Sequence, residues 1–263
     1  MKMTNIELQY KKILKKFINK GDTIFLHVDL SGFYKVYEIA KNKNEFYHFF
    51  ERLLIQLIGS EGTLITPSFS YSWKKGKSNS IFDLKKTPSS VGFFSNEALK
   101  SKIFTRTLDP IFSVLICGKH KNFFYDIGQY SFGENSIYEK LIEKDAKLIF
   151  LGIKKFEPTF VHYIEHQYNK HYKKYPYRFN KSLRGKIIKN NKVINKKIIC
   201  YLRPKNSNYI YNEPKVRKSI NKNKILKKLL LDNNVVQMIK AKDLYYFGIN
   251  QMIKNEKFFI TEK

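Results

Sequence analysis

Short apolar segments recur along this chain and alternate with helical segments. Strand-like runs occupy residues 23–28, 63–67, 112–117 and 148–151. Helices are expected at residues 5–19, 46–58, 93–99, 137–143 and 241–253. Buried strands that alternate with helices are typical of a sheet covered on both faces. The chain is therefore predicted to be an α/β protein with a central mixed, largely parallel sheet flanked by helices.

A late antiparallel hairpin is expected after these elements. Residues 187–202 contain strand-like stretches on both sides of Asn190-Asn191, a pair typical of hairpin turns. We expect this hairpin to extend one edge of the sheet. The chain contains no internal repeat and no low-complexity linker, so residues 1–263 are predicted to form a single domain.

The formal net charge of +28 suits a nucleic-acid or membrane-surface partner. However, the excess is mostly lysine, spread along the chain with many Asn and Ile, as in proteins from AT-rich genomes. Residues 170–197 are dense in lysine and form a candidate anion-facing surface, for which a solvated face is the simpler interpretation. Neither an RNA-binding aromatic motif nor a helix-turn-helix pattern is found, so no nucleic-acid partner is expected.

Location, metals and assembly are only loosely constrained. No apolar run approaches the roughly 20 residues of a membrane span, and the N-terminal segment lacks the pattern of a signal peptide. A cytoplasmic protein is expected. Cys117 and Cys200 lie in apolar runs and form no Cys/His cluster, so no metal is predicted. A homodimer would be ordinary.

A candidate catalytic pair follows the strand-like segment 148–151. His162 precedes Glu165 by three positions and His166 by four, so in a helix these side chains share one face. Functional sites of open α/β sheets lie at the carboxyl ends of strands. Histidine has an ordinary pKa of about 6.5 and serves well as a general base. The alternative is a solvated surface pair.

Four segments then occur in a set order along the chain. They read GDTIFLHVDLS at 21–31, GTLITPSF at 62–69, FD at 82–83 with TPSSVG at 87–92 and RTLDPIFSV at 106–114, and LG at 151–152 with TFVHYIEH at 159–166. This order and spacing resemble the aminoglycoside 3-N-acetyltransferase, or antibiotic N-acetyltransferase, family. The resemblance covers about residues 5–185.

The resemblance implies an enzyme that uses acetyl-coenzyme A to acetylate a primary amine of a sugar-like acceptor. It also implies an α/β fold unrelated to the GNAT acetyltransferases. His162 matches the family's catalytic histidine, and Glu165 matches the acidic residue that follows it on the same helix. The positions that contact coenzyme A or shape its channel in the family correspond to Ser31, Thr87, Ser89, Ser90 and Ser113.

The chemistry of amine acetylation assigns a role to each candidate catalytic residue. We expect His162 to act as general base while the amine attacks the thioester directly, because neither cysteine lies in a nucleophile-like motif. Glu165 is expected to orient the imidazole or hold the amine. Glu213 is an alternative carboxylate for orienting it.

Other candidates have a structural alternative. His27 and Asp29 lie at the end of one strand-like segment and Tyr71 follows another, so all three are candidate acceptor contacts. His27 also fits a core position, and Tyr71 a core or lid position. The serines and threonine of residues 87–90 are also expected to suit a helix cap that needs no ligand.

The departures from the family bear on the acceptor. Many members read Arg-Ser-x-His-Pro-x-His-Ser where this chain has residues 106–113, so Asp109 and Phe112 replace both histidines, and Ser90 replaces a frequent arginine. Residues 175–181 with Gly185 resemble relatives found with surface-polysaccharide genes.

A strongly basic protein repels polycations such as aminoglycosides. The sequence therefore favours a nucleotide- or lipid-linked amino sugar of bacterial surface-glycan biosynthesis as the acceptor. Aminoglycoside resistance, and a non-catalytic protein that binds nucleic acid or membrane surfaces, remain alternatives.

Overall fold

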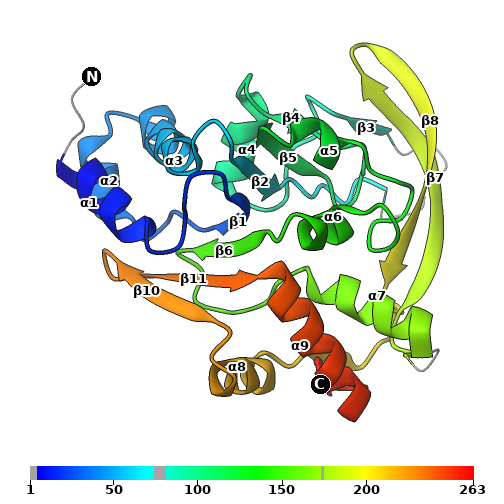
Figure 1. Ribbon diagram of the computed structural model, residues 1–263. Helices are drawn as coiled ribbons and strands as arrows, with labels where there is room; N and C mark the ends of the chain where they lie inside the picture. The colour runs from blue at the N-terminus through cyan, green and yellow to red at the C-terminus, as the bar shows by residue number, and fades with distance from the viewer. Residues whose placement is uncertain (1–4, 74–80, 173–174) are drawn as a thin grey trace.

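The central sheet runs through the middle of the molecule. A computed structural model describes residues 5–73, 81–172 and 175–263. Within these residues, seven strands form the sheet in the order β10–β11–β6–β1–β2–β5–β4 (Figure 1). Their bounds are β1 Thr23–Val28, β2 Thr63–Pro67, β4 Thr105–Arg106, β5 Val114–Gly118, β6 Lys147–Leu151, β10 Lys227–Leu231 and β11 Asn234–Lys240.

The sheet is mixed, and its parallel part is confined to the three strands at its centre. β1 pairs in parallel with both β2 and β6, whereas β5, β4, β11 and β10 all join in antiparallel pairings. β10 and β11 must be antiparallel because Asp232 and Asn233 connect them, both with the positive φ of a tight hairpin turn. The predicted mixed α/β sheet is confirmed, but parallel pairing is less extensive than expected.

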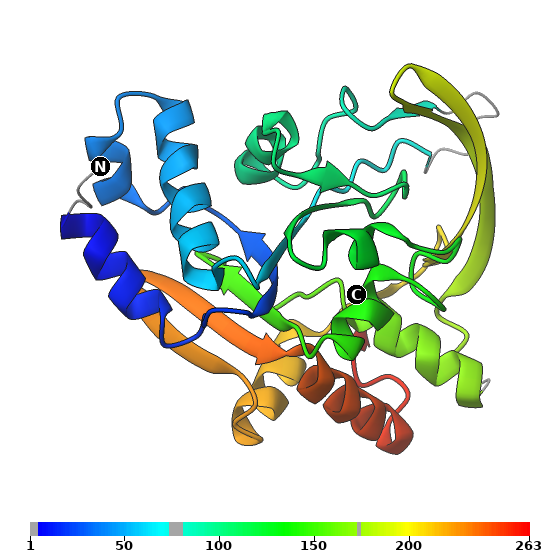
Figure 2. The ribbon, with the colours of Figure 1, turned by 45° about the horizontal axis from the view of Figure 1, so that its top comes forward.

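The side chains of the central strands point alternately into two hydrophobic cores, one on each face of the sheet. In β1, Ile24 and Leu26 face one core and Phe25 faces the other, because successive residues of a strand point to opposite faces. The first face is covered by α1 (Asn5–Leu14), α3 (Lys43–Ile58) and α4 (Phe93–Lys100). The opposite face is covered by α6 (Ile137–Glu143), α7 (Val161–Tyr172) and α9 (Ala241–Lys254), as Figures 1 and 2 show. Helices on both faces were expected, and this is confirmed.

The late hairpin forms where it was predicted but not in the predicted sheet. Its strands β7 (Phe179–Lys189) and β8 (Lys192–Leu202) are antiparallel, and β3 (Ile81–Asp83) pairs with β7 to make a separate three-stranded sheet. The expectation that the hairpin extends the central sheet is wrong, since the edge strands of that sheet are β10 and β4. The hairpin arches along one side of the molecule and ends beside α7 (Figure 1). It is anchored there because Leu183, Ile187, Ile198 and Cys200 are buried in the core.

Short elements complete the fold and were not predicted. They are α2 Tyr34–Ile39, α5 Lys121–Tyr125, α8 Glu213–Lys222, and the antiparallel pair β9 Tyr209–Tyr211 with β12 Ile260–Glu262. Among the described residues, no helix combines the length and apolar character needed to traverse a bilayer.

Candidate active site

The candidate catalytic pair lies at the start of α7, after the loop that leaves the carboxyl end of β6. His162 and Glu165 are one helical turn apart, and Nδ1 of His162 is 3.0 Å from Oε2 of Glu165. The Glu165 side chain is 2% exposed and that of His162 is 26% exposed. The imidazole therefore stands between a buried carboxylate and open space, and the spacing-based prediction of a shared face is confirmed.

Two residues that sequence reasoning did not assign to catalysis complete this cluster. Nε of Arg178 lies 2.6 Å from Oε2 of Glu165, and Nη2 of Arg178 lies 3.4 Å from Nε2 of His162. The hydroxyl of Tyr175 donates to Oε1 of Glu165. Both residues come from the chain between α7 and β7, so the base of the hairpin closes over α7. The only sequence signal was that the segment 175–181 resembled certain relatives.

These contacts determine the protonation of the pair. Burial alone would raise the pKa of Glu165, but Arg178 and the hydrogen bond with His162 lower it to about 2. Burial and, after it, the positive charge of Arg178 lower the pKa of His162 below its ordinary value. At neutral pH the imidazole is therefore uncharged. Because ionised Glu165 can only accept hydrogen bonds, it favours the tautomer with the proton on Nδ1, which leaves the lone pair on Nε2.

His162 and Arg178 line a cavity of about 530 Å³. Tyr71 and Phe112 form apolar parts of its wall, together with Val161. Tyr71 follows β2 and has a φ of 52°, a left-handed conformation that is costly for an aromatic residue and clusters at functional sites. The structure thus brings predicted Tyr71 to the same cavity as predicted His162. We call this the His162 cavity.

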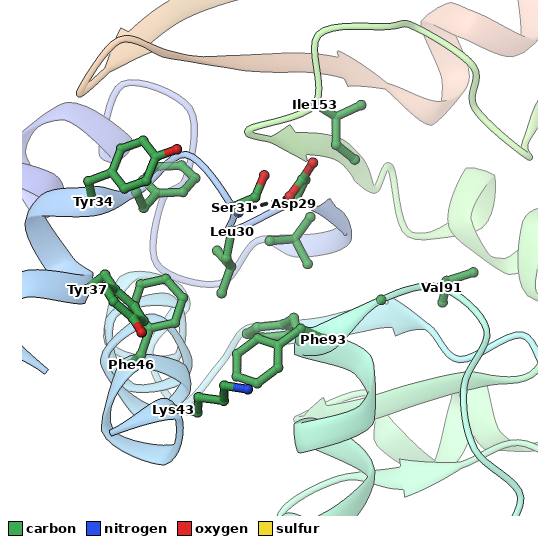
Figure 3. A pocket seen from close by; sticks show the side chains of 14 residues that line it. Asp29, Leu30, Ser31, Tyr34, Tyr37, Lys43, Phe46, Val91, Phe93 and Ile153 are labelled. Carbon is green, nitrogen blue, oxygen red and sulfur yellow. Dashed lines mark hydrogen bonds between the residues drawn. The ribbon is translucent and has the colours of Figure 1, made fainter. Parts of the chain in front are cut away.

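A second cavity of about 750 Å³ lies beside the end of β1. Asp29 and Ser31 border it, and the backbone N–H of Ser31 donates to Oδ1 of Asp29 at 3.0 Å (Figure 3). Tyr34, Tyr37, Phe46, Phe93, Val91 and Ile153 provide most of the remaining wall (Figure 3). We call this the Ser31 cavity. Its lining brings together one predicted coenzyme contact and one predicted acceptor contact.

The predicted residues of the segment 87–90 hold their loop in shape. Oγ1 of Thr87 accepts from the N–H of Asp83, and Oγ of Ser89 accepts from the N–H of Val91. The N–H of Ser90 donates to the carbonyl of Phe69. The helix-cap alternative is wrong, because Gly92 is the N-cap of α4 and no side chain caps this end.

Ser113 is fully buried and supports Arg106. Nε of Arg106 donates to Oγ of Ser113 at 3.1 Å, while Nη1 and Nη2 donate to the carbonyls of Thr87 and Ser68. One buried guanidinium therefore ties three loops together. A direct contact of Ser113 with coenzyme A stays a prediction.

The two departures from the family pattern have distinct structural roles. Oδ1 of Asp109 accepts from the N–H groups of Ile111 and Phe112, and Oδ2 accepts from Ser131. Asp109 thus stabilises a turn, whereas Phe112 lines the His162 cavity. The two positions expected to depart from the family pattern thus hold a turn-forming carboxylate and an aromatic wall.

Two predicted residues lie apart from the His162 cavity. The ring of His27 stacks on Phe150 with its Nε2 buried, and burial lowers the pKa of His27 to about 4. These are the features of a core histidine. Glu213 begins α8, accepts from the N–H of Phe156 and pairs with Arg217. Glu165, not Glu213, makes the observed contact with His162.

Comparisons with known proteins agree with the fold and with the family that the sequence resembles. The family model described as aminoglycoside 3-N-acetyltransferase matches residues 26–253. The structure of the YokD protein from Bacillus subtilis superposes with a TM-score of 0.73 at 17% identity. The match covers 98% of this chain and 96% of YokD. AAC-IIIb in a binary complex with CoASH has a TM-score of 0.73 at 16% identity, and AAC-VIa bound to sisomicin has 0.73 at 15%; each covers 94% of this chain and 96% of its own. No curated protein sequence matches this chain. At these identities the structural likeness establishes the shared fold.

Proposed function

Because this chain belongs to the aminoglycoside 3-N-acetyltransferase family, we propose that it acetylates a primary amine of an amino sugar carried on a nucleotide or a lipid. Acetyl-coenzyme A is the co-substrate, and bacterial surface-glycan biosynthesis is the proposed setting. The observation that carries the proposal is the contact of His162 with buried Glu165 at the wall of a cavity of about 530 Å³. That volume is typical of small-molecule sites.

His162 is proposed to act as the general base. Its Nε2 accepts a proton as the amine attacks the thioester carbon, and Glu165 then stabilises the imidazolium through Nδ1. The new C–N bond forms as the C–S bond breaks, and the imidazolium returns its proton to the leaving sulfur. Acetyl-coenzyme A supplies the activated acetyl group. Nη2 of Arg178 lies 3.4 Å from Nε2 of His162, so this guanidinium is a candidate donor for the developing oxyanion.

We assign the coenzyme to the Ser31 cavity. Its apolar walls with a few polar groups suit the long, mostly neutral pantetheine arm of the coenzyme. Ser31 lines this cavity directly, and the loop of Ser89 and Ser90 borders it through Val91. Thr87 and Ser113 support the same loop by way of Arg106. Asp29 stays a candidate for the acceptor, as does Tyr71 in the His162 cavity, while the contacts of His27 favour its structural alternative.

An aminoglycoside acceptor is the second candidate. AAC-VIa is known with sisomicin, and a mutant of AAC(3)-IVa with apramycin, so amine-rich antibiotics suit this fold. Against this, the chain has a net charge of +28 and its His162 cavity has more cations than acids in its wall. The non-catalytic alternative is disfavoured by family membership together with the His162–Glu165 pair.

The test is thiol release from acetyl-coenzyme A with a panel of nucleotide-linked amino sugars and aminoglycosides. We expect turnover with the anionic acceptors and a loss of about 10²–10⁴-fold in His162→Ala, the typical contribution of a positioned base. His171→Ala is the matched control, because His171 is exposed on the same helix. Comparable turnover of aminoglycosides would reject the anionic acceptor, and full activity of His162→Ala would reject the base.

A further inference from the structure

The His162 cavity is unbalanced in charge. Among the described residues that line it, Arg178, Lys181, Arg203 and Lys205 are cationic and Glu157 is acidic. Arg178 is neutralised by Glu165, which lies behind the wall. None of the ion pairs formed between described residues includes Lys181, Arg203 or Lys205. Within the described part of the chain, three cationic side chains therefore line the cavity without an ion-pair partner.

Arg203 is the most constrained of these three. It is half-buried at the end of β8, and its Nη1 donates to the carbonyl of Tyr209 at 2.6 Å. Burial and the neighbouring charge of Arg178 both lower its pKa. A half-buried cation near a second cation is stabilised by an anion that pairs with it. The bond to Tyr209 fixes one edge of the guanidinium and leaves its other N–H groups for a ligand.

The three cations come from both strands of the hairpin. Lys181 lies on β7, whereas Arg203 and Lys205 follow β8, and the register sets Lys181 opposite Cys200 near this end. The segments at this end of both strands therefore contribute cations to the lining of one cavity. Arginine and lysine together are suited to phosphate groups, the former as a fork and the latter as a point charge.

We propose that Lys181, Arg203 and Lys205 bind the phosphates of a diphosphate-linked amino sugar, so that its amine lies toward Nε2 of His162. Acetylation of the amine beside His162 rests on the proposed function, whereas binding of the phosphates does not depend on it. Nucleotide and lipid carriers share the diphosphate. The aromatic wall formed by Tyr71 and Phe112 is available for the sugar.

The first test is calorimetric binding of inorganic pyrophosphate to the full chain. The triple variant Lys181→Gln, Arg203→Gln, Lys205→Gln removes the proposed site. The control triple variant Lys186→Gln, Lys192→Gln, Lys197→Gln removes the same charge from exposed positions of the same hairpin. Thermal unfolding confirms that each variant folds. We expect at least about 10-fold weaker binding in the first variant alone, as charged hydrogen bonds are lost. Equal weakening in both variants would overturn the proposal, because general charge attraction would then explain the binding.

The second test compares acceptors. The same amino sugar is offered as a nucleotide diphosphate, a short polyprenyl diphosphate and an uncharged methyl glycoside. Arg203→Gln should lower the ratio of kcat/KM for the diphosphate-linked acceptors over the glycoside about 10-fold. An unchanged ratio would contradict the site, and the better diphosphate substrate identifies the carrier. Pyrophosphate binding at this site without turnover of any acceptor would reject the acetyltransfer proposal and leave the phosphate site standing.

Discussion

The two cavities at the carboxyl edge of the parallel strands differ in chemistry. The Ser31 cavity is walled mainly by aromatic and aliphatic side chains, and among its described lining residues only Asp29 and Lys43 carry charge. The His162 cavity is smaller and has four cations and one acid in its wall. Both begin where a central strand ends, since Ser31 follows β1 and Tyr71 follows β2. The same sheet edge thus presents one apolar site and one charged site.

This difference indicates a division of tasks. An apolar cavity holds a ligand mainly by burying its surface, so no single polar contact dominates. A charged cavity depends on a few paired groups, and the loss of one partner leaves another charge buried and unpaired. Single substitutions are therefore expected to be severe around Glu165 and mild around Ser31.

The largest effect is expected for Glu165→Gln. This change leaves Arg178 buried without its carboxylate, a loss that destabilises proteins by about 3–5 kcal/mol, and it also removes the group that orients His162. Urea unfolding and thiol release measure the two effects separately. The double variant Glu165→Gln, Arg178→Gln should recover stability but not activity. Recovery of both would mean that the pair is structural only.

Substitution of Ser113 is expected to have a smaller effect on stability than that of Glu165, and substitution of Ser31 none. Ser113→Ala leaves Nε of buried Arg106 without its partner and should lower the free energy of unfolding by about 1–3 kcal/mol. Ser31→Ala removes an exposed hydroxyl and should leave stability unchanged while raising the KM for acetyl-coenzyme A a few-fold. If Ser31→Ala instead raised the KM for the acceptor alone, the Ser31 cavity would have to be reassigned.

The last expected effect is on the pH dependence of stability. Burial lowers the pKa of both His27 and His166 to about 4, so between about pH 6.5 and pH 4 the unfolded chain binds protons that the folded chain does not. Stability should fall with decreasing pH in that window, by at most about 1.4 kcal/mol per pH unit for each histidine. Urea midpoints measured across the window test this. The variants His27→Gln and His166→Gln should each flatten the slope, and an unchanged slope in both would contradict it.

The sequence predicted the central strands well because their signals are local. The bounds of β1 and β2 match the expected 23–28 and 63–67, and the His162–Glu165 contact follows from helical spacing. Arg178 could not be found this way, because it reaches Glu165 only when the hairpin folds back over α7. The position of the hairpin was mispredicted for a related reason. A turn signal specifies that two strands pair, but not which sheet they join.

The central claim is that His162 is the base and is kept neutral by its surroundings. The most direct measurement is the pH dependence of kcat at saturating acceptor for wild type, His162→Ala and Arg178→Lys, because kcat/KM also falls when the free acceptor amine is protonated. Protonation of His162 stops it from accepting a proton, so wild-type activity should fall as the pH drops, with an apparent pKa below the ordinary value of about 6.5. Arg178→Lys should keep the charge and this acidic limb. In His162→Ala the residual activity should lack the limb and rise with added imidazole. An acidic limb that persists unchanged in His162→Ala would contradict the account.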